Sequence, residues 1–261
     1  SVQLIKDKQD RTMGRLYSVF THCMLLAARQ EGGLVRNIIG DRVMIVFPQD
    51  HCCTKAVNCA ITINHIAQLI NKKIDNLDFK CGIGIDYGRM RVMKVGIVTK
   101  GAENDDNKGL VWVGYPANFA SRLTDCANKE FTDIMYQVDA EFYHHNLWGD
   151  NILFGSKPSG WYRETQKLTA EELAKSLVVK TVGYGSALSV SKCINPVSIN
   201  RIEEKYTYDA ILISDAVYKG YKKENPNNKS FLEKWWKLQK RSIRDIDFDV
   251  WGANIHWNIS D

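Results

Sequence analysis

The stretch that decides the fold lies near the start of the chain and reads Leu34-Val35-Arg36-Asn37-Ile38-Ile39-Gly40-Asp41-Arg42-Val43-Met44-Ile45-Val46-Phe47. Two short apolar runs are separated only by Gly40 and Asp41, a spacing that is typical of a β-hairpin with a tight turn. A carboxylate therefore lies at the tip of the predicted hairpin. Because so short a turn joins antiparallel strands, the stretch favours a sheet that is largely antiparallel.

Helical patterns flank this hairpin on both sides. Residues 10–31 carry apolar side chains at helical spacing and are followed by Gly32 and Gly33, which predicts a helix with a glycine stop. Downstream, a second apolar stripe predicts a helix from about Asp50, a good N-cap residue, to Asn71. The hairpin is thus expected to lie between two core-facing helices.

The rest of the chain outside residues 129–205 is expected to mix strands and helices in the same way. Strands are predicted over residues 79–86, 89–95, 110–113 and 208–213, with a closing hairpin over 246–257. Helices are predicted from Pro116 to about Asn128, after a cap at Ser214 or Asp215, and over the basic residues 234–244. The polar segment 99–108 is expected to be an exposed hairpin loop. This order favours an α+β fold in which helices cover a mostly antiparallel sheet.

Residues 129–205 interrupt this order. They contain a capping box, Thr169-x-x-Glu172, which predicts the start of a further helix. No linker rich in Pro, Gly or Ser bounds the segment. We therefore interpret it as a large insert within a single domain that spans residues 1–261.

The composition is that of a soluble globular protein, with 44% hydrophobic and 25% charged residues among 261. A net charge of +5 is too small to indicate a nucleic-acid partner. The sequence has no apolar run of the ~20 residues that a membrane helix needs, and its start resembles neither a signal nor a transit peptide. The seven cysteines show no CxxC spacing, so we expect free thiols in a cytoplasmic protein.

Four segments in register resemble the catalytic domain of class III nucleotidyl cyclases. They are residues 36–47, Gly82-Ile83-Gly84-Ile85-Asp86-Tyr87-Gly88 with Val95-Gly96, Val113-Gly114-Tyr115-Pro116-Ala117-Asn118-Phe119-Ala120-Ser121-Arg122-Leu123, and Ile211-Leu212-Ile213-Ser214-Asp215-Ala216-Val217-Tyr218. Each segment alone is a weak signal, whereas four in the same order are specific. The resemblance covers roughly residues 10–128 and 205–257 and implies a ferredoxin-like cyclase fold, with the insert outside it.

The resemblance also implies roles for individual residues. Asp41 corresponds to one of two aspartates that hold two divalent cations, Mn²⁺ or Mg²⁺, beside the triphosphate. Asn118 would orient the ribose, and Arg122 would stabilise the charge that develops on the α-phosphate. Because these two residues are four apart on a predicted helix, both project from one face. In the family they act on the nucleotide of the opposite subunit, which implies a homodimer with shared active sites.

One part of the family pattern has no counterpart in these residues. The family places its first metal-binding aspartate on a strand that precedes the first helix, and here that helix begins near Asp10. Asp7 and Asp10 lie too close to the helix to fill this role. We therefore expect the first strand and the first metal aspartate to lie upstream of Ser1, in a longer protein from which this sequence is trimmed.

The residues at the base-reading positions match neither of the familiar cyclases. Adenylate cyclases carry Lys and Asp, and guanylate cyclases Glu and Cys, at the positions of Asn37 and Val111. Tyr115 replaces a usual Asp, and Tyr17 lies on the helix that borders the base pocket in the family. Bulky rings there would shorten the pocket and favour a one-ring base.

This combination resembles the pyrimidine cyclases of the Pycsar anti-phage system. It implies conversion of UTP, slightly preferred over CTP, to a cyclic monophosphate that activates a separate effector. Two alternatives remain open at this point. The protein could be an adenylate cyclase with an atypical base pocket, or a catalytically silent cyclase-like module that binds a nucleotide or a partner.

Overall fold

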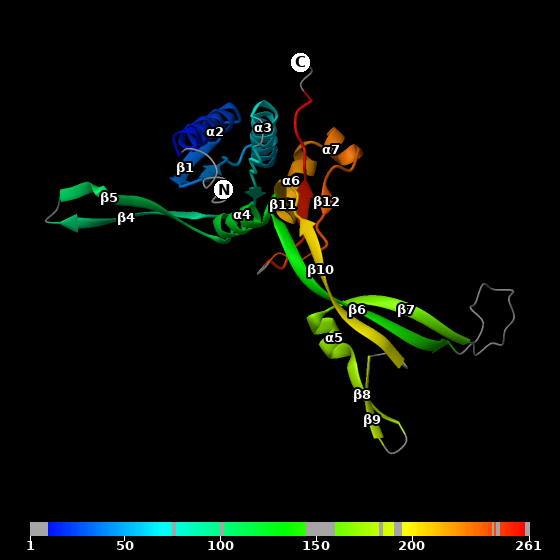
Figure 1. The fold of residues 1–261 in the computed structure, drawn as a ribbon. Coiled ribbons are helices and arrows are strands. Elements are labelled where there is room, and N and C mark those ends of the chain that lie inside the picture. Colours follow the sequence, from blue (N-terminus) through cyan, green and yellow to red (C-terminus); the bar gives the residue numbers. More distant parts are fainter. Residues whose placement is uncertain are drawn as a thin grey trace. The chain divides into compact units, whose positions relative to one another are not determined.

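The computed structural model describes residues 10–74, 77–99, 102–144, 160–182, 185–190, 195–241, 243 and 246–258. The chain divides into two compact units (Figure 1). The first comprises residues 1–129 and 207–261, and the second comprises residues 130–206. The bounds of the second unit lie close to those expected for the insert.

The first unit begins with the predicted helix–hairpin–helix arrangement. Its elements are α2 (Asp10–Gln30), β1 (Leu34–Ile39), β2 (Arg42–Val46) and α3 (Cys52–Lys73). β1 and β2 pair in antiparallel register up to Ile39 opposite Arg42, which confirms the hairpin. Gly40 at the turn has a φ of 57°, a left-handed conformation that favours glycine and explains why the turn forms at this point.

The prediction that Asp50 caps the second helix is wrong. The N-cap residue of α3 is His51, which has a φ of 49° and makes no side-chain capping hydrogen bond. Asp50 instead forms an ion pair with Lys55, whose Nζ lies 3.3 Å from Asp50 Oδ2. The left-handed backbone at His51 moves the first turn of the helix one residue further along the chain than the sequence suggests.

A four-stranded sheet forms the centre of the first unit. Its order is β12 (Lys237–Leu238), β13 (Val250–Ala253), β11 (Ile211–Ser214) and β3 (Ile83–Ile85). β3 and β11 run parallel, whereas β13 is antiparallel to both of its neighbours. Within the described ranges, β1 and β2 pair only with each other. The structure is thus α+β with mostly antiparallel pairing, as the sequence predicts.

Alternation along β3 places helices on both faces of this sheet. Ile83 and Ile85 pack into a buried cluster with side chains of α3, α6 (Asp215–Glu224) and β11. Gly82 and Gly84 point to the other face, against α4 (Tyr115–Cys126). A Cβ atom on Gly84 would lie 2.3 Å from the Ala120 carbonyl oxygen, so α4 contacts the strand at backbone distance.

Two further predictions in this unit are corrected. The polar segment 99–108 is not a loop, because β4 (Arg91–Thr99) pairs with β5 (Ala102–Val113) as far as Thr99 opposite Ala102. Backbone hydrogen bonds sustain such a hairpin whatever the side chains, provided that both faces can be solvated.

The basic segment 234–244 is not a helix either. α7 is short and ends before it (Lys229–Leu232), and Lys234 has a φ of 54°, which interrupts helical geometry. Lys237 and Leu238 then form β12 and pair with Gly252 and Trp251. Strand pairing at the sheet edge therefore overrides the helical composition of this segment. The expectation of a closing hairpin over residues 246–257 is wrong, because the described part of that range forms one strand, β13, which pairs with β12 and β11 outside it.

The second unit has a sheet and a small core of its own. β6 (Glu130–His144) lies between β10 (Asn195–Thr207) and β7 (Gly160–Thr169), and α5 (Ala170–Ser176) lies beside β6 and β7 (Figure 1). β8 (Leu177–Val182) and β9 (Gly185–Val190) form a separate hairpin. The core consists of Val138 and Ala140 with Leu168 and Leu173 packed against them.

The predicted capping box begins α5. Thr169 N donates to Glu172 Oε2 at 2.8 Å, and Glu172 N donates to Thr169 Oγ1 at 3.2 Å. Two backbone donors at the start of the helix are thereby satisfied reciprocally. This confirms the capping-box prediction.

Two expectations from composition can be compared with the structure. Six cysteines in the described part of the chain are free thiols, namely Cys23, Cys52, Cys53, Cys59, Cys81 and Cys126, while Cys193 lies outside it. None of the helices in the described ranges combines the length and apolar character needed to cross a bilayer.

Candidate active site

The hairpin tip that carries Asp41 is bound to helix α4. Asp41 lies exposed in the β1–β2 turn. The next residue, Arg42, donates from Nη1 to Ser121 Oγ at 3.1 Å and from Nη2 to the Asp125 carboxylate. Residues about 80 positions apart in the sequence are thereby brought together at one place on the first unit.

The face of α4 beside this contact carries the two other predicted reactive residues. Asn118, Ser121, Arg122 and Asp125 have the spacing i, i+3, i+4 and i+7, so they form one stripe along the helix. Asn118 and Arg122 are both exposed. Since Ser121 and Asp125 bind Arg42, the structure brings the hairpin tip and this stripe together. Chemically, the arrangement offers a carboxylate for a hard cation and an amide and a guanidinium for an anionic ligand.

Arg122 lies over one ring of an aromatic cluster. Its Cζ lies 5.7 Å from the centroid of the Phe119 ring, within cation–π range. Phe119 stacks on Tyr115 with a centroid distance of 5.9 Å and meets Phe248 edge-on at 5.0 Å. Arg122 therefore lies on a cluster of three rings.

An open pocket of about 750 Å³ adjoins these rings. Its wall includes the three rings, the loop after β3 and the start of α6, with the residues Asp86, Tyr87, Gly88, Arg89, Tyr115, Pro116, Phe119, Ser214, Asp215, Ala216, Lys219 and Phe248. Burial raises the pKa of Asp86 above its ordinary value. Asp215 is paired with Lys219 at 2.5 Å. The pocket thus has aromatic walls and charges of both signs.

The two predicted base-reading positions lie on contacting hairpins. Asn37 is on β1 and Val111 is on β5, and both side chains are exposed. Between the same strands, the Arg36 guanidinium lies 5.7 Å from the centroid of the Trp112 ring. A β-bulge between Val35 and Asn37 interrupts the regular alternation of β1 at Arg36, so the pleat of the strand does not determine the side to which Asn37 points relative to Arg36.

The two predicted pocket tyrosines belong to different clusters. Tyr17 is half-buried in α2 and meets Phe79 edge-on with a centroid distance of 6.2 Å, inside the core between α2 and α3. Tyr115 is 77% exposed at the start of α4 and stacks on Phe119. The structure therefore does not bring these two rings together.

Large apolar side chains are exposed on the two hairpins of the first unit. They lie on β1, β4 and β5 and include Ile38, Ile39, Val92, Met93, Val95, Leu110, Val111 and Val113. Ile39, beside the turn that carries Asp41, is 66% exposed. Such clustering of exposed apolar side chains is typical of a protein–protein contact surface.

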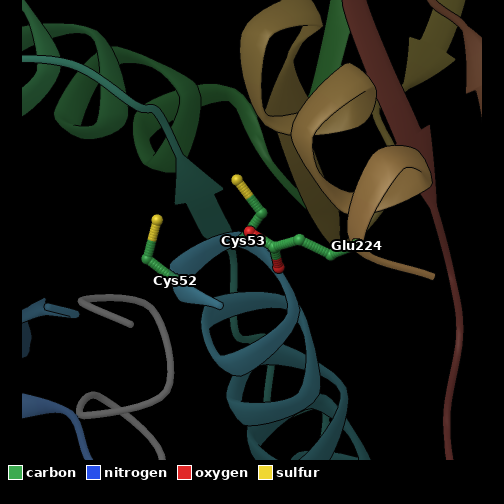
Figure 2. Close-up of side chains that lie close together, drawn as sticks. All are labelled: Cys52, Cys53 and Glu224. Carbon is green, nitrogen blue, oxygen red and sulfur yellow. The ribbon is translucent and has the colours of Figure 1, made fainter. Parts of the chain in front are cut away.

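One cluster of potential metal donors was not predicted from the sequence. Cys52, Cys53 and Glu224 place one donor atom each within 4.8 Å of one another, and no other such group of three occurs among the described residues (Figure 2). Burial, together with the nearby Cys52 and Glu224, raises the pKa of Cys53 to about 12. Because metals bind thiolates, a thiol that stays protonated is a poor ligand.

Glu224 accepts hydrogen bonds from the first turn of α3. Its Oε2 accepts hydrogen bonds from Thr54 N at 2.8 Å and from Thr54 Oγ1 at 2.5 Å. α3 has no side-chain cap of its own at His51, so a carboxylate from α6 caps it instead. No local sequence signal could have revealed this contact, because Glu224 and Thr54 lie 170 positions apart.

Comparison with known proteins identifies the family. No protein-family model matches the chain. A protein named uridylate cyclase from Burkholderia cepacia is 35% identical over 171 residues, which cover 63% of this chain and 68% of that protein. The chain therefore belongs to the uridylate cyclase family, which confirms that the four segments indicate a nucleotide cyclase.

Two further relatives carry the same name. The protein from Gulbenkiania mobilis is 29% identical over 158 residues, covering 56% of this chain and 59% of the relative. The protein from Xanthomonas perforans is 34% identical over 135 residues, covering 48% of this chain and 55% of the relative. The chain thus spans little more than half the length of these two proteins.

Proposed function

We propose that the protein is a metal-dependent cyclase that converts a pyrimidine nucleoside triphosphate, UTP in preference to CTP, to the 3′,5′-cyclic monophosphate and pyrophosphate. One observation carries the proposal. The chain belongs to the uridylate cyclase family, and it exposes a carboxylate at the hairpin turn, Asp41, and an amide and a guanidinium on one face of α4, Asn118 and Arg122.

The proposed reaction is an in-line displacement at phosphorus. The ribose 3′-oxygen gives up its proton to solvent water and bonds to the α-phosphorus, while the bond from that phosphorus to the bridging oxygen breaks and its electron pair leaves with pyrophosphate. Arg122 would neutralise the charge that develops on the α-phosphate oxygens, since a guanidinium pairs well with phosphate. Asn118, one turn earlier on the same face, would orient the ribose by hydrogen bonding.

Asp41 is the residue that we assign to a divalent cation. Its carboxylate is exposed at a turn, and Mg²⁺ and Mn²⁺ prefer such oxygen donors. No cluster of three or more His, Cys, Asp or Glu donors in the described ranges includes Asp41, so we assign this residue alone. When bound, the cation would neutralise the triphosphate and lower the pKa of the attacking hydroxyl.

We also propose that two copies of the chain form a homodimer in which Asp41 of one subunit and Arg122 of the other serve one nucleotide. The exposed apolar side chains of β1, β4 and β5 support this proposal, since they offer a contact surface on the same hairpins that carry Asp41, Asn37 and Val111. A head-to-tail dimer of this kind would contain two equivalent sites.

Product analysis tests the reaction. The protein is incubated with Mn²⁺ and, separately, with each of the four ribonucleoside triphosphates, and products are identified by mass spectrometry. We expect cyclic UMP as the main product and less cyclic CMP. Release of cyclic AMP alone would support an adenylate cyclase, and binding of nucleotide without any cyclic product would overturn the proposed activity in favour of a silent module.

Matched substitutions test the assigned residues. Asp41→Ala and Arg122→Ala should each abolish turnover. Their controls are Asp78→Ala and Arg163→Ala, which remove similarly exposed charges elsewhere in the chain and should leave turnover intact. Equal losses in a variant and its control would contradict the assignment.

Mixing the two inactive variants tests the shared site. After subunit exchange, half of the dimers are mixed and each retains one intact site, so about a quarter of the wild-type activity should return. No recovery after proven exchange would show that Asp41 and Arg122 act within one subunit.

The resemblance to pyrimidine cyclases extends the proposal to a biological role. We propose that the cyclic product is a second messenger of anti-phage defence, made in the cytoplasm and sensed by a separate effector. Cyclic UMP should rise on infection in cells that carry the protein and not in cells that carry the Asp41→Ala variant. An unchanged level after infection would contradict this role.

A further inference from the structure

The side chain proposed to stabilise the transition state is held against an aromatic ring. Arg122 is exposed on α4, and its Cζ lies 5.7 Å from the Phe119 ring centroid, three residues earlier. A long side chain at an exposed position samples many rotamers unless a neighbour restricts it. The flat guanidinium packs well on the face of a ring, so Phe119 limits the directions in which Arg122 can point.

Phe119 is itself held from two sides. Tyr115 stacks on it at 5.9 Å with an interplanar angle of 17°, and Phe248 meets it at 5.0 Å with an angle of 88°. These are the stacked and edge-on geometries that aromatic pairs prefer. Tyr115 is mostly exposed, whereas Phe248 lies near the end of the chain and joins the ring to a segment that is distant in the sequence.

The backbone around Phe248 is fixed to the central sheet. The carbonyl oxygen of Asp249 accepts a hydrogen bond from Asp215 N at 2.9 Å, at the start of α6. Val250, the next residue, is buried and pairs with Ser214 of β11. Contacts therefore run without interruption from the sheet through Phe248 and Phe119 to the guanidinium of Arg122.

We propose that Phe119 and Phe248 are positioning residues for Arg122, which orient its guanidinium toward the α-phosphate of the nucleotide. This inference rests on the proposed cyclase function and adds two residues to which no role in that reaction has been assigned. Misplacing a group that acts mainly in the transition state lowers kcat and leaves ground-state binding nearly unchanged. Phe119→Leu and Phe248→Leu should therefore lower kcat about two- to fivefold and leave KM nearly unchanged.

A double substitution separates positioning from general damage to the fold. In an Arg122→Lys background, the planar guanidinium is gone, so Phe119→Leu should cause little further loss of kcat. Phe119→Tyr keeps the ring face and should restore most of the activity. Phe131→Leu, which alters a stacked ring in the second unit, is the control and should leave kcat unchanged. Equal fold losses from Phe119→Leu in the two backgrounds would overturn the proposal.

A second measurement does not depend on turnover. The Nε–Hε group of Arg122, labelled with ¹⁵N in the full chain, reports the order of the side chain by NMR relaxation. We expect a higher order parameter in the wild type than in Phe119→Leu or Phe248→Leu. The same value in all three proteins would overturn the positioning proposal even in an active cyclase. Conversely, loss of order in a protein that forms no cyclic nucleotide would refute the proposed function and leave the positioning contact demonstrated.

Discussion

Replacement of Gly84 by alanine tests how closely α4 packs against the sheet. Alanine there would place a Cβ atom 2.3 Å from Ala120 O, 2.5 Å from Thr124 N and 2.6 Å from Leu123 Cβ. Ordinary contacts of this kind are longer by about 1 Å, so α4 would have to move away by roughly that distance. Two of the three atoms belong to the helix backbone, which cannot be relieved by turning a side chain.

The cost of Gly84→Ala follows from these distances. Overpacking a well-packed interface typically costs about 1–3 kcal/mol, and a clash with backbone lies at the upper end. Gly84 N also donates to Thr124 Oγ1 at 3.0 Å, and breaking that bond adds about 1 kcal/mol. We therefore expect Gly84→Ala to lower the free energy of unfolding by about 3–4 kcal/mol.

Urea denaturation followed by tryptophan fluorescence and far-UV circular dichroism measures the effect. Gly109→Ala is the matched control, because a Cβ atom there meets nothing within 4 Å, and it should change the free energy of unfolding by less than about 0.5 kcal/mol. Gly14→Ala, in the second turn of α2, should raise the free energy of unfolding by about 0.5–1 kcal/mol. A Gly84→Ala variant as stable as Gly109→Ala would refute the close contact between β3 and α4.

Four further predictions concern charges and thiols. The Arg42–Asp125 pair is about half exposed, so a double-mutant cycle should give a coupling of about 0.5 kcal/mol that 1 M NaCl removes; a coupling that persists in salt would contradict this view. Burial raises the pKa of Asp86, so its ionisation opposes folding as the pH rises, and Asp86→Asn should raise Tm at pH 8 more than at pH 4. A lower Tm of Asp86→Asn than of the wild type at pH 8 would contradict this expectation, because it would mean that the ionised carboxylate stabilises the fold. Burial also raises the pKa of Cys59 from 9.0 to about 12, so iodoacetamide at pH 8.5 should label Cys23 well before Cys59 by peptide mass spectrometry. For the same reason, the unfolded thiol ionises first and the free energy of unfolding should fall as the pH rises above 9.

Much of the fold could be predicted because its signals are local. Gly40 and Asp41 between two apolar runs specify the hairpin through the turn that they form. Pro116 marks the first turn of α4, and Thr169 with Glu172 marks the start of α5. In each case the residues that carry the signal also make the contacts, so no information from distant parts of the chain is needed.

The errors arise where distant residues decide the local structure. Lys237 and Leu238 lie in a segment of helical composition but form a strand, because Trp251 and Gly252 offer them a sheet edge. The start of α3 is capped by Glu224 of α6 and not by the neighbouring Asp50. Neither partner can be inferred from the segment itself, since many other residues of the same type occur elsewhere in the chain.

In the candidate site, short motifs indicate the chemical groups but not the residues that orient them. The proposed reactive groups, Asp41, Asn118 and Arg122, are named from short motifs, because the proposed chemistry requires those residue types. What orients them could not be named, since Arg42 binds α4 across 79 positions and Phe248 reaches Phe119 from near the other end of the chain. Arg and Phe have so many ordinary uses that neither signals such a role by itself. Substituting these orienting residues therefore tests the structure of the site more directly than removing the reactive groups, whose loss would abolish turnover whatever held them in place.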